Sequence, residues 1–355
     1  MINKTDDLRI RGIKEVIAPE EIHTQFPSTE NGQKTVSETR QAIHKILTGE
    51  DDRLIIIIGP CSIHDVKAAK EYATHIKTAR EKLGRDLLII MRVYFEKPRT
   101  TVGWKGLIND PDLDGSFEIN KGLGIARDLL VSVNEMGVPT ATEFLDLISP
   151  QYVADQISWG AIGARTTESQ VHRELASGLS CPVGFKNATD GGVSVAIDAI
   201  ASASRPHVFL SVTKQGKSAI FSTTGNEDCH IILRGGAEPN YDATHVDAVS
   251  EQLENNHTKP NLMIDFSHAN SQKQYQKQID VAENVSQQVA EGDSRIIGAM
   301  IESHLVEGRQ NCDNKDDLVY GQSITDACIS WDDSYKVLVK LSEAVQQRRV
   351  ALADD

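Results

Sequence analysis

The sequence predicts an α/β protein built as a (β/α)8 TIM barrel, with an N-terminal arm and helix before the barrel and a β-hairpin inserted into it. Short, continuous apolar runs recur along the chain, and eight of them alternate with stretches that have helical spacing. Continuous apolar runs are typical of parallel strands covered on both faces. Eight such strands alternating with helices favour a closed barrel.

The elements can be assigned in chain order. Residues 1–50 are expected to form an arm and a helix, roughly Glu38–Thr48. Residues 51–350 are expected to form the catalytic barrel. Its predicted strands are Leu54–Ile58, Leu87–Met91, Val138–Ala141, Ala161–Ala164, Pro182–Phe185, Ile231–Leu233, Leu262–Ile264 and Ile296–Ile301. Before the sixth of these strands, an insertion at about 206–224 predicts a hairpin of Val208–Val212 and Ser218–Phe221.

Composition narrows the class of protein. The chain has 37 Lys and Arg against 51 Asp and Glu, a formal charge of −14, which argues against nucleic acid and anionic membranes as partners. No apolar stretch reaches the ~18 residues of a membrane helix, and the polar start lacks a signal-peptide core. We therefore expect a cytoplasmic protein. Its five cysteines include no CxxC pair, so neither a disulfide framework nor a structural zinc module is expected.

Ionisable or metal-binding side chains stand at or just past the end of every predicted strand. In strand order they are Cys61, Arg92, Glu143, Arg165, Lys186, Arg234, His268 and Glu302. Barrel enzymes build their sites at the carboxyl ends of several strands. The pattern therefore predicts an active site at that end of the barrel.

Six cations are expected at this barrel mouth. They are Arg92, Lys97, Arg99, Arg165, Lys186 and Arg234. Arginine suits two-pronged binding of phosphate or carboxylate, and lysine acts as a mobile positive charge. A cluster of this size would repel itself without anionic ligands, so it indicates more than one phosphorylated substrate. The alternative is that these cations pair with acids such as Glu96 and Glu143.

A second group of side chains predicts a metal site. Cys61, His268 and Glu302 follow the first, seventh and eighth strands, and Asp326 lies on the segment after the last strand. First and eighth strands are neighbours in a closed barrel. A thiolate, an imidazole and two carboxylates suit one divalent transition-metal ion, with Mn2+, Fe2+, Zn2+ and Co2+ all open. Alternatively, Cys61 is a small buried apolar group and His268 a histidine that binds no metal.

Taken together, several motifs resemble those of type I 3-deoxy-D-arabino-heptulosonate 7-phosphate (DAHP) synthases, and the resemblance spans roughly residues 5–350. The motifs, in order, are Gly59-Pro-Cys-Ser-Ile-His-Asp65, Lys97-Pro-Arg-Thr100, Gly103-Trp-Lys-Gly106, Gly163-Ala-Arg-Thr-Thr-Glu168, Pro182-Val-Gly-Phe-Lys-Asn187, Leu233-Arg-Gly235, Asp265-Phe-Ser-His-Ala-Asn270 and Glu302-Ser-His-Leu305. The resemblance implies condensation of phosphoenolpyruvate with erythrose 4-phosphate and water, which yields DAHP and phosphate and opens the shikimate pathway to the aromatic amino acids.

The resemblance also implies roles for individual residues. Metal ligands would be Cys61, His268, Glu302 and Asp326. Arg92, Lys97, Arg165, Lys186 and Arg234 would bind phosphoenolpyruvate, and Arg99 and Thr100 would bind the phosphate of the aldose. The catalytic set would be Lys97, His268, Asp326 and Cys61, with proton transfer left open among the first three. Oxidation could in addition join Cys61 to Cys328.

Feedback regulation is implied by the arm and the inserted hairpin, which regulated members of this family share. The effector residues would be Leu147, Pro150, Gln151, Leu175, Leu179, Ser180, Phe209, Ser211 and Phe221, with Asp6 and Asp7 supplied by a neighbouring subunit of a homodimer or homotetramer. Serine at Ser211 resembles the phenylalanine-sensitive type, because its hydroxymethyl group would fill the space that a tyrosine hydroxyl needs. The alternative is that Phe209 and Phe221 are only core residues of the hairpin.

Other functions stay open at this point. The nearest is the sibling synthase that uses arabinose 5-phosphate and makes an eight-carbon product. A Schiff-base aldolase acting through Lys186 belongs to a different enzyme class. A non-catalytic amino-acid-sensing paralogue is the non-enzymatic alternative.

Overall fold

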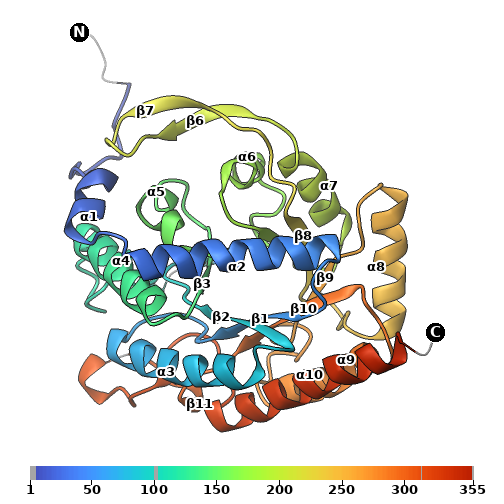
Figure 1. The fold of residues 1–355 in the computed structure, drawn as a ribbon. Coiled ribbons are helices and arrows are strands. Elements are labelled where there is room, and N and C mark those ends of the chain that lie inside the picture. The colour runs from blue at the N-terminus through green and yellow to red at the C-terminus, as the bar shows by residue number, and fades with distance from the viewer. Residues whose placement is uncertain (1–4, 100–102, 313, 354–355) are drawn as a thin grey trace.

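The computed structural model describes residues 5–99, 103–312 and 314–353. Its centre is a closed barrel of eight parallel strands in the order β1-β10-β9-β8-β5-β4-β3-β2, which confirms the predicted fold class (Figure 1). The barrel strands are β1 (Leu54–Gly59), β2 (Leu87–Arg92), β3 (Thr140–Glu143), β4 (Trp159–Ile162), β5 (Val183–Lys186), β8 (Cys229–Leu233), β9 (Leu262–Asp265) and β10 (Ile296–Glu302).

Helices connect the strands and surround the barrel. They are α3 (Val66–Leu83), α4 (Ile119–Glu135), α5 (Pro150–Val153) with the 3-10 turn η1 (Ala154–Gln156), α6 (Gln170–Gly178), α7 (Ser194–Ala203), α8 (Ala243–Asn255), α9 (Lys277–Ala290) and α10 (Trp331–Ala351). Among the described residues, no helix combines the length and apolar character that a membrane crossing requires.

Two apolar clusters stabilise this arrangement. In β1, Ile55 and Ile57 belong to the cluster inside the barrel, whereas Ile56 and Ile58 belong to the larger cluster beneath the surrounding helices. This alternation follows from the two-residue period of a strand. Because both faces are covered, all six residues of β1 are buried, as the continuous apolar run predicted.

The N-terminal extension contains two helices, α1 (Pro19–Gln25) and α2 (Glu30–Thr48). The predicted end of α2 is confirmed, but the predicted start at Glu38 is wrong by two turns. The helix begins after Thr29, whose hydroxyl accepts a hydrogen bond from the Gly32 amide at 3.0 Å and so caps the first turn. It ends at Gly49, whose φ of 87° suits glycine.

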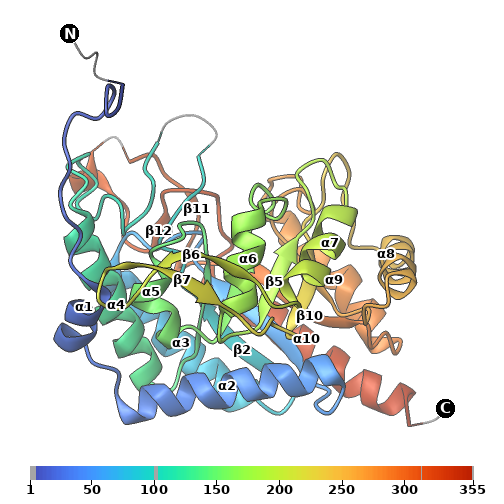
Figure 2. The same ribbon diagram turned by 90° about the horizontal axis from the view of Figure 1, so that it is seen from above.

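Helix α2 closes one end of the barrel. Its residues Ile43, Ile46 and Leu47 belong to the apolar cluster that fills the barrel interior. In Figure 2, α2 crosses the lower edge of the molecule, and the loops that follow the strands extend toward the upper edge. The carboxyl ends of the strands therefore remain as the open mouth.

Two strand predictions need correction. β3 covers 140–143 rather than 138–141, and β4 covers 159–162 rather than 161–164. Val138 is buried in the turn after Gly137, whose φ is 79°. Trp159 begins β4, because its backbone pairs with Ala141 of β3 and its side chain belongs to the apolar cluster inside the barrel.

The inserted hairpin is present where the sequence predicts it. Strands β6 (Val208–Val212) and β7 (Ser218–Ser222) form a separate antiparallel sheet outside the barrel. Its tip lies on the N-terminal extension and on α5, since the Lys214 ammonium donates to the Gln151 carbonyl and the Glu20 amide donates to Lys214 O. A second small sheet, β11 (Val306–Arg309) with β12 (Gln322–Ser323), follows the last barrel strand near the 3-10 turn η2 (Lys315–Asp317) and was not predicted.

Candidate active site

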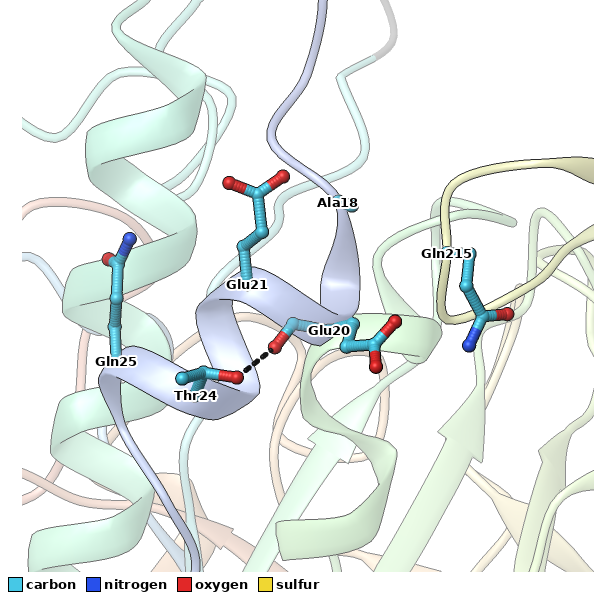
Figure 3. A pocket seen from close by; sticks show the side chains of 6 residues that line it. All are labelled: Ala18, Glu20, Glu21, Thr24, Gln25 and Gln215. Carbon is cyan, nitrogen blue, oxygen red and sulfur yellow. Dashed lines mark hydrogen bonds between the residues drawn. The ribbon is translucent and has the colours of Figure 1, made fainter.

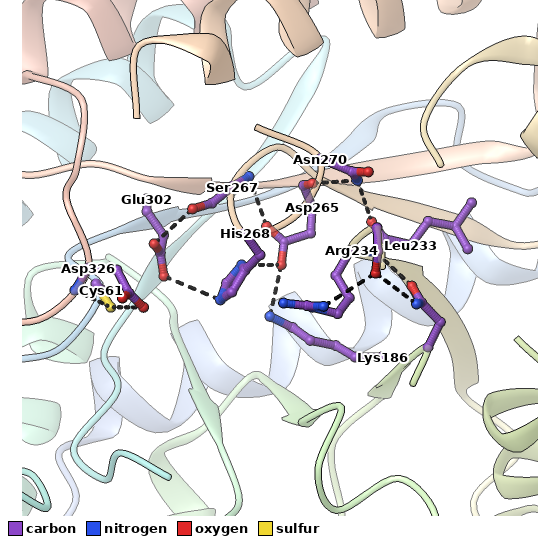
Figure 4. A network of polar contacts seen from close by, with 12 residues as sticks. Cys61, Lys186, Leu233, Arg234, Asp265, Ser267, His268, Asn270, Glu302 and Asp326 are labelled. Carbon is purple, nitrogen blue, oxygen red and sulfur yellow. Dashed lines mark hydrogen bonds and ion pairs between the residues drawn. The ribbon is translucent and has the colours of Figure 1, made fainter. Parts of the chain in front are cut away.

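The predicted site residues gather at the carboxyl end of the barrel. Arg92, Glu143, Lys186 and Glu302 are the last residues of β2, β3, β5 and β10. Cys61, Arg165, Arg234 and His268 follow β1, β4, β8 and β9 by one to three residues. Parallel strands bring these positions to one end of the barrel, so side chains that are far apart in sequence meet there (Figure 4).

Three of the four predicted metal ligands form a tight cluster. One ligand atom each of Cys61, Glu302 and Asp326 lies within 4.8 Å of the other two. The Cys61 thiol donates to Oδ2 of Asp326 at 3.4 Å. His268 stands at the edge of this cluster, with its Nε2 3.9 Å from Oε1 of Glu302.

The donor atoms of this cluster fit a divalent transition metal. Oε1 of Glu302 is buried and accepts no hydrogen bond from the described residues, although charged neighbours lie close to it. Burial and then the Glu302 charge raise the pKa of the Cys61 thiol to about 12, so the thiol is protonated and its proton leaves when a metal binds. A thiolate, an imidazole and two carboxylates suit such an ion.

An acidic residue outside the predicted set orients His268. The Oδ2 atom of Asp265 lies 2.9 Å from Nδ1 of His268 and accepts a hydrogen bond from the Lys186 ammonium at 2.8 Å. Asp265 is fully buried, which disfavours its charge, but His268 and Lys186 hold its pKa well below its ordinary value. The carboxylate therefore turns Nε2 of His268 toward the metal cluster, a common arrangement for metal-binding histidines.

Arg92 and Lys97 connect the cations to the metal cluster. The Arg92 guanidinium donates to the carbonyls of Pro60 and Cys61 at 3.1 and 3.2 Å, and its Nη2 lies 3.0 Å from Oε1 of Glu302. Lys97 donates to Sγ of Cys61 at 3.1 Å. Burial lowers the pKa of Lys97, but the Cys61 sulfur and the carboxylates of Asp326 and Glu302 outweigh it and raise that pKa above its usual value.

The remaining cations line the mouth with more exposure. Arg165 is exposed and Arg234 is half-buried, and burial, with a contribution from the Arg165 charge, lowers the pKa of Arg234. Arg99 is exposed and donates to the Trp104 carbonyl at 2.8 Å. Thr100, predicted with it, lies outside the described residues. Like charges at this mouth favour anionic ligands.

A network of three buried asparagines supports the site, and the sequence reasoning missed it. Oδ1 of Asn187 accepts from the Arg234 amide at 2.8 Å, and Oδ1 of Asn240 accepts from the Gly235 amide at 2.7 Å. Asn270 accepts from the Asn240 amide at 2.8 Å and donates to the carbonyls of Leu233 and Asp265 (Figure 4). The network fixes the loops after β5, β8 and β9. Only Asn187 follows its strand directly, whereas Asn240 and Asn270 lie farther along their loops, so a local signal in the sequence existed for Asn187 alone.

Among the described residues, Glu96 forms no ion pair with the cations, contrary to the alternative considered for them. Its Oε2 accepts a hydrogen bond from the Ser149 hydroxyl at 2.8 Å. Burial, followed by repulsion from Asp146, raises its pKa to about 7. This bond connects the loop of Lys97 to the loop that precedes α5.

The predicted effector residues lie in three places: on the hairpin, around α5 and α6, and on the N-terminal arm. The rings of Phe209 and Phe221 stack on one face of the hairpin, with centroids 6.2 Å apart, and Ser211 shares that half-buried face. The hairpin is joined to α6 by a 2.7 Å contact between the hydroxyls of Ser177 and Thr223. On and around α5 and α6 lie Leu147, Pro150, Gln151, Leu175, Leu179 and Ser180. Asp6 and Asp7, by contrast, are exposed on the arm.

A pocket near these elements contains none of the predicted residues. It has a volume of about 460 Å³ and lies between α1 and the hairpin tip (Figure 3). Its lining consists of Ala18, Glu20, Glu21, Thr24, Gln25 and Gln215. Two carboxylates in an open pocket disfavour phosphate, so the substrate site remains at the barrel mouth.

Comparison with known proteins gives a consistent result. The family model described as the DAHP synthetase I family matches residues 26–339. The Phe-sensitive phospho-2-dehydro-3-deoxyheptonate aldolase of Escherichia coli is 63% identical over 346 residues, which cover 98% of this chain and 99% of the relative. The phospho-2-dehydro-3-deoxyheptonate aldolase of Haemophilus influenzae is 60% identical over 98% of this chain and 97% of its own length.

A solved structure extends the likeness to three dimensions. The phospho-2-dehydro-3-deoxyheptonate aldolase of Francisella tularensis superposes with a TM-score of 0.94 at 54% identity, over 96% of this chain and all of that chain. The Trp-sensitive enzyme of Escherichia coli is less similar, at 52% identity.

Proposed function

The chain belongs to the DAHP synthetase I family and is a DAHP synthase, and we propose that it joins phosphoenolpyruvate to erythrose 4-phosphate at the barrel mouth under feedback control by phenylalanine. The observation that carries the proposal is the contact between the cations and the metal cluster through Arg92 and Lys97. An anion held by these cations would lie directly beside the metal ligands. This is the arrangement that the condensation of an anionic enol with an aldehyde requires.

Phosphoenolpyruvate would be held by Arg92, Lys97, Arg165, Lys186 and Arg234. Lys186 and Arg92 are buried and already fixed by Asp265 and Glu302, whereas Arg165 and Arg234 are more exposed. The two buried cations would set the position of the reacting end, and the outer two would bind the phosphate. Such orientation can lower a barrier by about 7–11 kcal/mol. Arg99 and Thr100 would bind the aldose phosphate.

The divalent metal would be held by Cys61, His268, Glu302 and Asp326. The ion could be Mn2+, Fe2+, Zn2+ or Co2+. When bound, such an ion stabilises negative charge on the aldehyde oxygen during carbon–carbon bond formation. Asp265 keeps Nε2 of His268 aimed at the cluster, and Ser267 donates to Oε2 of Glu302 at 2.9 Å. These contacts fix the ligands before a metal binds.

Proton transfer would fall to Lys97, His268 and Asp326. The raised pKa of Lys97 keeps its ammonium charged, so it can donate a proton to an oxygen that gains negative charge. Burial raises the pKa of Asp326, but Lys97 and His268 outweigh it and lower that pKa below its ordinary value. Asp326 therefore stays ionised and can accept a proton from the attacking water.

Phenylalanine would bind on the hairpin face formed by Phe209, Ser211 and Phe221, next to α5 and α6. Asp6 and Asp7 are exposed on their own arm, which leaves them free to reach a neighbouring subunit. A homodimer or homotetramer would follow, and we infer that the enzyme works in the cytoplasm. The similar Escherichia coli enzyme is named Phe-sensitive, which supports phenylalanine as the effector.

The decisive experiment measures phosphate release from phosphoenolpyruvate with erythrose 4-phosphate or arabinose 5-phosphate, with and without EDTA and each aromatic amino acid. Turnover with the four-carbon aldose, loss with EDTA and inhibition by phenylalanine are expected. Preference for arabinose 5-phosphate would identify the sibling synthase. Borohydride trapping of Lys186 with substrate and activity in EDTA would identify a Schiff-base aldolase. Absence of turnover with every metal would support a sensing paralogue.

A further inference from the structure

A buried tyrosine lies against the deepest cation of the site. Tyr94 follows β2 by two residues, and only 1% of its surface is exposed. The guanidinium carbon of Arg92 lies 3.5 Å from the centroid of its ring, which is within the range of a close cation–π contact. The ring belongs to the apolar cluster inside the barrel, together with Ile57 and Ile90. The barrel core thus supports Arg92 from below.

The hydroxyl of Tyr94 has no partner in the protein. Its oxygen is buried and makes no hydrogen bond to any of the described residues. Buried hydroxyls are nearly always hydrogen-bonded, because an unsatisfied one loses its bonds to water without gaining others. Burial raises the pKa of this phenol, so it is neutral and can donate. The charges that act on it come from Arg92, Glu143, Asp265 and Glu302, all of which belong to the barrel mouth.

Arg92 itself has one uncommitted edge. Its Nε donates to Pro60 O, and its Nη2 donates to Cys61 O and faces Glu302. Nη1 makes no hydrogen bond to the part of the chain that the structure describes. The ring of Tyr94 fixes the plane of the guanidinium and the carbonyls fix its rotation, so the direction of this edge is set in advance. Fixed donors of this kind bind an anion with less loss of entropy.

We propose that Tyr94 is a further residue of the phosphoenolpyruvate site. Its ring positions the Arg92 guanidinium, and its hydroxyl donates a hydrogen bond to an oxygen of bound phosphoenolpyruvate. The inference rests on the proposed function, because it takes Arg92 as a phosphoenolpyruvate ligand. It adds a neutral donor to a set of phosphoenolpyruvate ligands that are otherwise all cations.

Two substitutions separate the two roles. Tyr94→Phe keeps the ring and removes only the hydroxyl, and it should raise the KM for phosphoenolpyruvate about 3- to 10-fold while the KM for erythrose 4-phosphate stays unchanged. Tyr94→Leu removes the ring as well, and kcat/KM for phosphoenolpyruvate should fall about 10-fold further. Tyr152→Phe, assayed without phenylalanine, is the control, since it removes a buried hydroxyl that bonds to Ile17 O instead.

Particular outcomes would overturn each role. An unchanged KM for phosphoenolpyruvate in Tyr94→Phe would mean that water satisfies the hydroxyl. Equal kinetics of Tyr94→Phe and Tyr94→Leu would show that the ring does not position Arg92. Should Tyr94→Leu fail to fold by circular dichroism, Tyr94→Met replaces it. Calorimetric titration of Tyr94→Phe with phosphoenolpyruvate decides the hydroxyl's role without turnover.

The variant Arg92→Lys shows whether a negative result contradicts only the role of Tyr94 or the proposed phosphoenolpyruvate site itself. If Arg92→Lys weakens phosphoenolpyruvate binding and the Tyr94 variants do not, the inference alone is wrong. If Arg92→Lys binds phosphoenolpyruvate as the wild type does, the proposed substrate site is itself wrong.

Discussion

Arg92 and Glu302 form an ion pair at 3.0 Å in which both side chains are 2% exposed, and this pair joins the cation cluster to the metal cluster. Removing one partner of such a pair leaves a buried charge uncompensated. The same contact means that occupancy of one site is sensed at the other. A metal bound to Glu302 would take up its charge and leave Arg92 free to attract an anion.

We therefore expect the metal to strengthen phosphoenolpyruvate binding, and by linkage phosphoenolpyruvate to strengthen metal binding equally. Removal of the metal should raise the Kd for phosphoenolpyruvate at least about 5-fold. Calorimetry in Mn2+ and in EDTA measures the effect. The same Kd in both buffers would contradict it.

Metal binding should depend on Cys61 and release its proton. Because the pKa of the free thiol is raised to about 12, metal affinity should rise roughly tenfold per pH unit near neutrality. Competition with a coloured chelator at several pH values measures this slope. Cys61→Asp, whose carboxylate is already ionised, should flatten it, and Cys61→Ala should abolish metal-dependent turnover. Near-normal activity of Cys61→Ala in added Mn2+ would rule out Cys61 as a ligand.

His230 should make the fold sensitive to acid. Its Nε2 accepts a hydrogen bond from the Trp159 indole at 3.0 Å, and burial lowers its pKa to about 4. In the unfolded chain the His230 imidazole takes up a proton near pH 6.5, whereas in the folded chain it stays neutral until about pH 4. Stability is therefore lost as the pH falls from about 6.5 to 4. The loss should be roughly 3 kcal/mol. His230→Gln cannot titrate, and urea unfolding should show its shallower pH dependence.

Glu96 should have the opposite pH signature. Its pKa is about 7 in the fold against an ordinary value of 4.5, so the folded state retains a proton that the unfolded state has lost. Stability from this group therefore falls as pH rises from about 4.5 to 7. Glu96→Gln cannot titrate at this position. The free energy of unfolding of the variant minus that of the wild type should therefore be larger at pH 7.5 than at pH 4.5. A constant difference would contradict the buried, protonated carboxyl.

Ser211 should determine which aromatic amino acid inhibits. Ser211→Gly opens space on the face shared with Phe209 and Phe221, so tyrosine should become the stronger inhibitor. Inhibition curves for both amino acids, with kcat as the control, check this. Equal inhibition of the wild type by tyrosine and phenylalanine would weigh against the phenylalanine assignment.

The sequence predicted most of the barrel because its strands are buried on both faces and so read as apolar runs such as Leu54–Ile58. The ends of the predicted strands then indicated Arg92, Lys186 and Glu302 as site residues. The start of α2 was missed, since its first turns are polar and depend on the Thr29 cap. The roles of Asn187, Glu96 and Tyr94 were missed because they depend on side-chain contacts that only the folded chain forms. The partners are Arg234, Ser149 and Arg92, respectively.

Helix α2 has a practical consequence for engineering a DAHP synthase that escapes feedback control. Its residues Ile43, Ile46 and Leu47 complete the barrel core, so the extension that contains the arm also contains part of the hydrophobic floor. Deleting residues 1–49 would expose that floor and promote aggregation. Desensitised variants should therefore come from point substitutions or from trimming the arm before Pro19, which would separate control from folding.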